Sequence, residues 1–261
     1  MISLFWLHNP ARMKTISVVN MGALILRIQD DLESHVEESY RRSFQDRFGI
    51  NATVYFGVRT PVVREIADRY YREILSMIPT DRLRRCVDLL ETGIYEMRIL
   101  AFRWANRTVR DLSALDVEIP VSWIDRYVTD WSDCDDLCMQ VIGTLFLRFP
   151  AQAFQVLDWC SSPNRWKRRA ASVALIRAGR QGLQLGLIFE VSRALAADSD
   201  DLVRKAHGWL LRETSRKRPD EVFQHLLDHR HMLPRAVVTM ASRKFTPDRQ
   251  DQLRGTFDAV R

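Results

Sequence analysis

The 261-residue sequence has few of the residues that build tight turns, with ten glycines and nine prolines. This scarcity argues against a strand-rich fold, in which short strands alternate with many turns. The four cysteines form no CxxC pair and have no zinc-ligand spacing, so we expect reduced thiols buried as small apolar side chains. His225, His229 and His231 lie close in sequence but lack a supporting carboxylate set. We therefore predict surface histidines, with no metal site and no cofactor.

Long hydrophobic runs are also missing, since no stretch approaches the roughly 20 uncharged residues of a membrane span. The apolar run Ile2–Leu7 is too short for a secretory signal and has no basic segment before it, so we expect a cytoplasmic protein. Met13 and Met21 are alternative starts. We accordingly treat residues 1–22 as an N-terminal extension, whose translation in the cell is open, and residues 23–261 as a single domain.

The composition is that of an ordinary globular protein with a basic balance. Hydrophobic residues make up 46% and charged residues 28% of the chain, which excludes a disordered protein. Lysine and arginine total 39 against 33 aspartate and glutamate, so the formal net charge is +6. An excess of positive charge favours a polyanionic partner such as nucleic acid.

Helix-start signals recur along the chain and predict an all-α fold. The residues 24–48 read as one amphipathic helix, and later helices begin at proline or aspartate. The predicted later helices cover residues 61–67, 83–90, 95–109, 121–129, 151–159, 165–178, 202–217 and 221–229, with two more after Pro234 and Pro247. Related starts at Pro79, Pro120 and Pro163 lie about forty residues apart, the spacing of HEAT and armadillo units. We therefore predict a curved superhelical array whose inner helices line a concave basic groove; a non-repetitive helical bundle is the alternative.

The stretch Val128–Cys138 predicts a helix start that is unusually rich in carboxylates. Either Ser132 or Asp133 is expected as the N-cap, and apolar residues then recur at helical spacing (Leu137, Cys138, Val141, Ile142, Leu145). Four aspartates crowd this turn, which is more than capping requires. Trp131 and Asp135 are four residues apart, so a helix places an indole and a carboxylate on one face.

Two further segments combine tryptophan with positive charge. The first contains Trp166, within residues 159–180, which hold six basic residues and no acidic one. The second is residues 203–212, in which Lys205, Trp209 and Arg212 share a helical stripe, and Gly208 predicts a close approach to the backbone. Core packing and a solvated face explain each segment taken singly. Together, on the inner side of one array, they fit a nucleic-acid backbone better.

Four signatures in order resemble the DNA alkylation repair family, the AlkD-type HEAT-like alkylpurine DNA glycosylases, over most of residues 25–245. They are Phe56-Gly-Val-Arg-Thr-Pro61, Trp131-x-x-x-Asp135, Trp166-x-x-Arg169 and Arg204-Lys-Ala-His-Gly-Trp-Leu-Leu-Arg-Glu213. The resemblance implies that Trp131 and Trp209 flank the sugar of the lesion, that Asp135 is the catalytic carboxylate, and that Arg169 is a backbone-gripping partner. Asp133 and Asp136 remain alternatives for the carboxylate, and Tyr40 is a possible counterpart of a family tyrosine.

The implied activity is hydrolysis of the N-glycosidic bond of N3- and N7-alkylpurines in duplex DNA, as the first step of base excision repair. Such bases are cationic and leave readily, and a carboxylate stabilises the positive charge that develops on the sugar. We expect a monofunctional, monomeric enzyme that associates with the nucleoid and grips the DNA backbone without a deep base pocket. The expected DNA contacts are Arg59, Arg64, Arg148, Arg165, Trp166, Lys167, Arg168, Lys205 and Arg212.

Two other functions compete with this prediction. A family member could bind damaged, bent or branched DNA without excising a base, although a pure binder would not need the carboxylate. A protein-binding HEAT scaffold is compatible with the fold alone. Such a scaffold should not lose binding steeply with salt, whereas a duplex binder should.

Overall fold

The computed structural model describes residues 20–48 and 54–258, and within these ranges the fold is all-α, as predicted. The only extended pairing among them is an isolated bridge between Val54 and Ile94. No helix in the described part of the chain is long and apolar enough to cross a membrane. The proposed extension falls almost entirely outside the described residues, so the structure does not bear on it.

The helices form a stack of antiparallel pairs. An outer layer contains α1 (Met21–Glu33), α4 (Pro79–Leu90), α6 (Glu118–Tyr127), α9 (Val156–Trp159), α12 (Leu185–Ala194) and α14 (Pro219–Asp228). The inner layer contains α3 (Thr60–Ile74), α5 (Tyr95–Thr108), α7 (Trp131–Asp135) with η4 (Asp136–Ile142) and α8 (Gly143–Arg148), α10 (Arg165–Val173) with α11 (Ile176–Gln181), α13 (Asp201–Thr214) and α15 (Arg235–Ala241). Each inner helix packs on the next one along the chain. We call these the inner helices.

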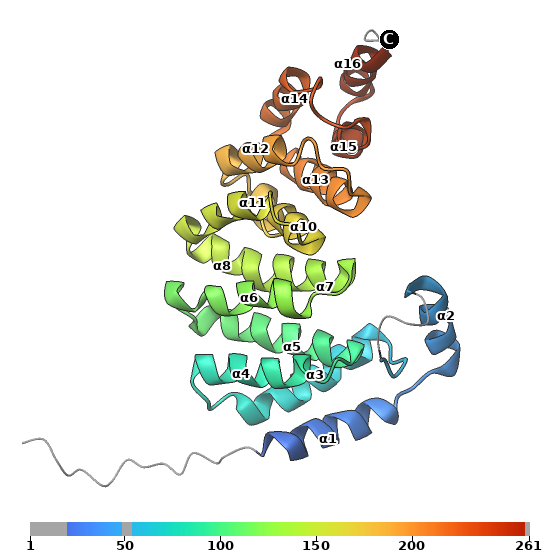
Figure 1. Cartoon of the computed structure of the whole chain (residues 1–261), viewed down its shortest axis with the longest axis vertical. Coiled ribbons are helices and arrows are strands. Elements are labelled where there is room, and N and C mark those ends of the chain that lie inside the picture. Colours follow the sequence, from blue (N-terminus) through green and yellow to red (C-terminus); the bar gives the residue numbers. More distant parts are fainter. Residues whose placement is uncertain (1–19, 49–53, 259–261) are drawn as a thin grey trace, which may run out of the picture.

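The stack is bowed rather than straight. In Figure 1, α2 (Glu38–Phe48) at one end and α15 with α16 (Pro247–Asp258) at the other project to the same side. A stack of helix pairs bends in this way when each pair is slightly rotated on its neighbour. The predicted curved array is therefore confirmed, in preference to an irregular bundle.

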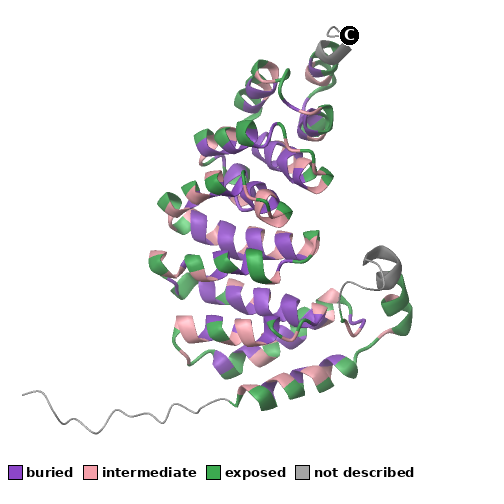
Figure 2. Ribbon diagram, in the orientation of Figure 1, coloured by how far each residue is buried: buried purple, intermediate pink, exposed green. Residues whose placement is uncertain are grey.

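Figure 2 shows that buried residues run along the helices through the middle of the stack, and that exposed residues gather at its margins. Leu137, Cys138, Val141, Ile142 and Leu145, the apolar face predicted after Trp131, have no exposed surface. All four cysteines are buried and unpaired, which confirms that they act as small apolar residues.

Three expectations about the helices are wrong in detail. The predicted helix over residues 24–48 is interrupted, because Ser34 Oγ donates to the carbonyl of Asp31 and the chain leaves the helix before α2 begins. The predicted helix over 165–178 is divided at residues 174–175 into α10 and α11. Helix α12 was not predicted at all: its start has no side-chain cap, and Gln184 before it adopts a left-handed φ of 53°. Local start signals are absent there, and packing forms the helix.

The histidines near the C-terminus are not all on the surface. His225 is buried, stacks on Phe189 with ring centroids 4.2 Å apart, and shares a hydrogen bond with Ser192 Oγ. Burial lowers the pKa of His225 to about 4, so it is neutral at physiological pH. His231 is exposed, as expected.

Glycine allows two inner helices to approach closely. A Cβ on Gly208 of α13 would lie 2.7 Å from Met240 Cβ and 3.1 Å from the carbonyl oxygen of Val237, both on α15. The close approach predicted at Gly208 is thus confirmed, and the group that approaches it is helix α15 of the same protein.

We expect Gly208→Ala to lower the free energy of unfolding by about 1–3 kcal/mol, because the methyl group overpacks the α13–α15 contact. Urea unfolding followed by circular dichroism measures this change. Gly186→Ala is the matched control, since a Cβ there meets nothing within 4 Å and alanine favours the helix. Equal stability of both variants would contradict the close contact.

Candidate functional site

The start of α7 is fixed to α5 by polar contacts. The N-cap is Asp130, whose Oδ1 accepts from the backbone N–H groups of Ser132 (2.7 Å) and Asp133 (2.9 Å), so the expected cap at Ser132 or Asp133 is wrong by a few residues. Tyr95 on α5 shares a hydrogen bond with Ser132. The helix therefore starts at Trp131, one residue after its cap.

Asp133 is a structural carboxylate. It is buried, accepts from Arg98 Nε at 3.0 Å, and also accepts from the backbone N–H and hydroxyl of Thr129. Burial and the charge of Asp130 raise the pKa of Asp133, and Arg98 opposes them. All its contacts lie inside the protein, which leaves it unavailable to a substrate.

Asp135 is held by Arg169 of α10. Nε and Nη2 of Arg169 donate to both oxygens of Asp135 at 2.8–3.0 Å, and Nη1 donates to the carbonyl of Leu202 on α13. Arg169 is buried, whereas the Asp135 side chain keeps 17% of its surface exposed. Burial raises the pKa of Asp135 to about 6, against the attraction of Arg169. Asp135 is therefore a partly exposed carboxylate whose orientation is fixed by Arg169.

Asp136 points toward a different neighbour from Asp135. The helix widens into a π-helical turn over Asp136–Ile142, directly after Asp135, a distortion that is frequent at functional sites. Asp136 faces α3 and α5, and burial raises its pKa, although the charge of Arg64 opposes this. Asp135 and Asp136 therefore serve two adjacent surfaces.

The three tryptophans of the sequence signatures lie on successive inner helices. Trp131 is 42% exposed at the first position of α7, one turn before Asp135. Trp209 is half-buried on α13, on the same stripe as Lys205 and Arg212. Trp166 is half-buried at the start of α10, under the guanidinium of Arg165 at 5.6 Å. The structure thus brings Trp131, Asp135 and Arg169 together and places Trp209 on the next inner helix.

Most of the predicted phosphate contacts have partners within the protein. Arg59 pairs with Glu37, Arg165 with Asp200, Lys167 with Asp125, Arg168 with Asp198 and Arg212 with Glu213. Arg148, at the far end of α8, donates to the carbonyl of Val109. Because these cations are already neutralised or engaged, binding a phosphate requires them to exchange partners. Arg64 and Lys205 face open hollows instead.

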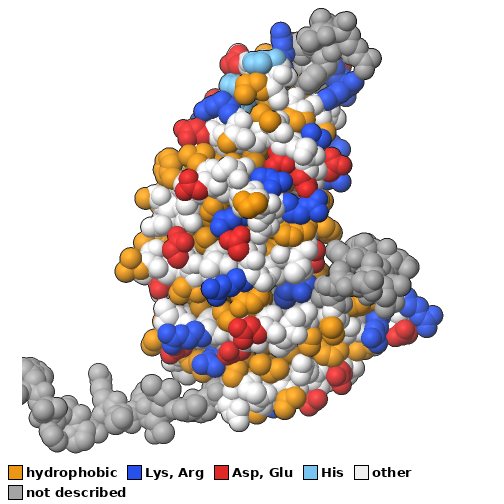
Figure 3. Space-filling model, viewed as in Figure 1, with side chains coloured by type: hydrophobic (Ala, Val, Ile, Leu, Met, Phe, Trp, Pro, Cys, Tyr) orange, Lys and Arg blue, Asp and Glu red, His pale blue; other side chains and the backbone are white. Residues whose placement is uncertain are grey.

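Other basic residues lie on the inner helices, and the sequence analysis did not name them as DNA contacts. One hollow is lined by Arg103, Arg107 and Arg110 of α5 and its end, together with Arg177 of α11, and a neighbouring one is lined by Arg177 and Arg180. These arginines recur every three or four residues, which places them on one face of a helix, and this spacing could have identified them in the sequence. On the face shown in Figure 3, positive side chains are interspersed with acidic ones and do not form one block.

Within the described residues, no three histidine, cysteine, aspartate or glutamate side chains gather closely enough to hold a metal ion.

We expect Asp133→Asn to lower the free energy of unfolding by about 3 kcal/mol, because it removes the closer of the two carboxylates that pair with the buried Arg98 and leaves only Asp130, at 3.7 Å. Chemical unfolding measures the loss. Asp158→Asn on α9 makes the same chemical change at an exposed position and should have no measurable effect. A destabilisation no larger than that of Asp158→Asn would show that Asp133 is not a structural group.

Comparison with known proteins connects this geometry to a family. A search of curated proteins finds no match. A solved structure described as a predicted DNA alkylation repair enzyme from Enterococcus faecalis superposes with a TM-score of 0.73, covering 82% of this chain and 98% of that one. The two are 14% identical, so this likeness shows a shared fold. The family model described as DNA alkylation repair enzyme matches residues 28–245, and the chain therefore belongs to the DNA alkylation repair enzyme family.

Proposed function

We propose that the protein is a monofunctional DNA glycosylase that hydrolyses the N-glycosidic bond of cationic N3- and N7-alkylpurines in duplex DNA. The observation that carries the proposal is Asp135, a partly exposed carboxylate fixed by a bidentate arginine and placed one turn from the exposed Trp131. A structural carboxylate would be paired and fully buried, as Asp133 is.

The proposed reaction needs one carboxylate and one water. As the bond between C1′ and the base nitrogen breaks, its electron pair neutralises the positive charge of the leaving base. Positive charge develops on the sugar, and ionised Asp135 stabilises it. Water adds to C1′ and gives its proton to Asp135 or to solvent, which yields a free base and an abasic site.

Arg169 is a positioning residue in this proposal. All three of its nitrogens donate to Asp135 or to Leu202, so the guanidinium orients the carboxylate and lowers its pKa toward the ionised form. The sequence resemblance implied that Arg169 grips the DNA backbone; in the structure its guanidinium donates instead to Asp135 and to the carbonyl of Leu202.

Trp131 and Trp209 supply aromatic faces for the cationic lesion and its sugar. An indole face attracts a cation by about 0.5–2 kcal/mol through its quadrupole. The basic residues of the inner helices would hold the duplex by its phosphates, so binding should weaken as salt rises. We propose that a monomer in the cytoplasm does this on DNA without a deep base-flipping pocket.

The second candidate is a non-catalytic binder of damaged, bent or branched DNA. The many charged side chains on the inner helices support it equally well. Asp135 disfavours it, because a carboxylate repels phosphate and a binder gains nothing from one at its surface.

We expect Asp135→Asn to reduce the release of N7-methylguanine from alkylated duplex DNA by about 100-fold or more, because the amide cannot balance the charge on the sugar. Chromatography of the released base measures the rate, and fluorescence anisotropy measures duplex binding, which should be retained. Asp158→Asn is the control for the same chemical change.

The outcomes separate the candidate functions. Steep salt-dependent binding by the wild type without base release supports the non-catalytic binder. If the wild type neither releases a base nor binds duplex DNA, both DNA functions are wrong. If Asp135→Asn releases N7-methylguanine as fast as the wild type does, a group other than Asp135 is the catalytic one.

A second prediction concerns pH. Asp135 must be ionised, and its pKa is raised to about 6, so the enzymatic rate should fall about tenfold per pH unit below that value and level off above it. Arg169 lowers this pKa, and Arg169→Gln should therefore move the midpoint to higher pH. Single-turnover rates, corrected for spontaneous base loss, measure both midpoints.

Arg84→Gln is the control, because Arg84 lies on the outer helix α4 and is largely exposed. Its pH profile should match that of the wild type. A midpoint near 4 in the wild type would show that burial does not raise the pKa of Asp135. A midpoint that Arg169→Gln leaves in place would argue against ionised Asp135 as the catalytic group.

A further inference from the structure

Arginines follow one another across the C-terminal halves of the inner helices. A hollow lined by Arg103, Arg107 and Arg177 joins α5 to α11, and the next hollow is lined by Arg177 and Arg180. Arg180 in turn meets Glu213 of α13. We define the arginine row as the side chains that continue this path from α5 over α11 to α13 and just beyond its end: Arg103, Arg107, Arg177, Arg180, Arg212 and Arg216.

The arginine row carries more positive charge than its partners neutralise. Among the described residues, only two carboxylates form ion pairs with its six guanidinium groups, Asp68 and Glu213. Asp68 of α3 accepts from Arg103 at 2.8 Å and from Arg107 at 2.7 Å, and the hydrogen bond from Arg103 lowers its pKa. The partner of Arg177 is uncharged, since it donates to the side-chain oxygen of Gln140 at 3.3 Å.

Glu213 is shared by three arginines. Its side chain is 3% exposed, and it accepts from Arg180 at 2.9 Å, from Arg212 at 3.0 Å and from Arg216 at 3.3 Å. Burial opposes its ionisation, but the hydrogen bonds from Arg180 and Arg212 lower its pKa. One carboxylate cannot neutralise three cations, and Arg180 and Arg216 stay about half exposed. Glu213 therefore gathers guanidinium donors from two helices, and their fork geometry suits phosphate oxygens.

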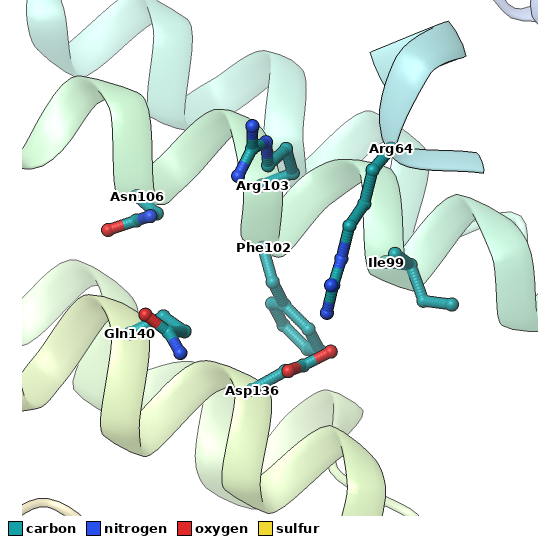
Figure 4. A pocket seen from close by; sticks show the side chains of 7 residues that line it. All are labelled: Arg64, Ile99, Phe102, Arg103, Asn106, Asp136 and Gln140. Atoms are coloured by element: carbon teal, nitrogen blue, oxygen red, sulfur yellow. The ribbon is translucent and has the colours of Figure 1, made fainter. Parts of the chain in front are cut away.

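A cavity lies between Asp136 and the start of the arginine row. It measures about 140 Å³ and is lined by Arg64, Ile99, Phe102, Arg103, Asn106, Asp136 and Gln140. Figure 4 shows Arg64 and Asp136 directed toward the same space, with Asn106 and Gln140 farther toward the C-terminal ends of their helices. Because Asp136 repels a phosphate, it marks a boundary between the side of the inner helices that carries Asp135 and the side that carries the row.

The arginine row is also well separated from the candidate catalytic carboxylate. Arg169, which holds Asp135, donates to the carbonyl of Leu202, whereas Arg180 donates to Glu213. Both residues of the second contact are eleven positions farther along the chain than those of the first. At about 1.5 Å per helical residue, the two levels are about 16 Å apart. The grooves of B-DNA are about 6 and 12 Å wide, so this offset reaches from a sugar at Asp135 across a groove to the other strand.

We propose that the arginine row binds the phosphates of the undamaged strand, while Asp135 and the two tryptophans beside it face the damaged strand. The inference rests on the proposed action on duplex DNA and adds which strand each side of the inner helices holds. Phosphate contacts position a duplex without reading its sequence. Contacts to both strands fix the rotation of the duplex about its axis, and this sets the damaged sugar against Asp135 without a pocket for the base.

The salt dependence of duplex binding tests the arginine row. The probe is a duplex with one N7-methylguanine whose sugar carries a 2′-fluorine, because fluorine disfavours positive charge on the sugar and so prevents base loss. We expect Arg177→Gln and Arg180→Gln each to weaken binding about fivefold or more at low salt, and to reduce the slope of log affinity against log salt by about one. Fluorescence anisotropy measures both quantities.

Arg84→Gln is the matched control, since Arg84 lies on the outer helix α4 and is largely exposed. It should bind the duplex as the wild type does. In Arg180→Gln, Glu213 keeps Arg212 and Arg216 as partners, so we expect this variant to remain folded. Chemical unfolding of each variant checks this expectation.

Methylphosphonate linkages, which carry no charge, identify the strand. A run of four is moved along either strand of the probe duplex, and binding is measured for the wild type and for the protein with both Arg177→Gln and Arg180→Gln. In the undamaged strand, the most effective run should weaken wild-type binding about fivefold or more but weaken binding by the double variant less than about twofold, because the charges that it removes have already lost their partners. Runs in the damaged strand should weaken both proteins equally.

The proposal is overturned if Arg177→Gln and Arg180→Gln bind the duplex as the wild type does, because the arginines then serve only the C-terminal ends of their helices. It is also overturned if neutral linkages in the undamaged strand weaken the double variant as much as the wild type, or if the double variant instead loses the effect of those in the damaged strand.

These outcomes are distinct from failure of the proposed function. Base release by the wild type, with binding that the row variants leave unchanged, removes the arginine row and keeps the glycosylase. Binding that depends on the row and on the undamaged strand, without any base release, keeps the row and removes the glycosylase. If the wild type binds no duplex DNA, both proposals are wrong.

Discussion

The guanidinium of Arg169 joins three successive inner helices, and the candidate site depends on it. It contacts Asp135 of α7 through two nitrogens and Leu202 of α13 through the third, while its own backbone belongs to α10. A buried arginine has to satisfy its donors inside the protein. The requirement to pair Arg169 therefore fixes the orientation of Asp135 and ties the site to the spacing between helix pairs.

The four aspartates after Thr129 have separate tasks although they share one turn. Asp130 caps α7, Asp133 neutralises Arg98, Asp135 meets Arg169, and Asp136 faces the cavity beside Phe102. Successive residues of a helix point about 100° apart, so adjacent carboxylates reach different helices. This arrangement explains why so many acids gather in a basic protein, since each meets a positive group or a surface of its own.

Sequence periodicity predicted most helices and the buried face after Trp131, because amphipathic spacing reflects which side packs. It failed at α12, where no capping side chain marks the start and the helix forms by packing on its neighbours. It also failed for His225, which reads as a polar surface residue but is buried against Phe189 and Ser192. In both cases the deciding contacts come from residues that are distant in sequence or on another helix.

The chain by itself determined the all-α class, the curved repeat and the family, and it singled out the aromatic and acidic residues of the candidate site. Local hydrogen bonding and hydrophobic periodicity carry that information. Only the tertiary structure decided which carboxylate is structural and which is partly exposed, which cations are already paired, and that Arg64, Asn106 and Asp136 converge on one cavity. Burial and ion pairing between helices depend on how the helix pairs stack. The stacking geometry depends on residues that are distant in sequence, so no single segment determines it.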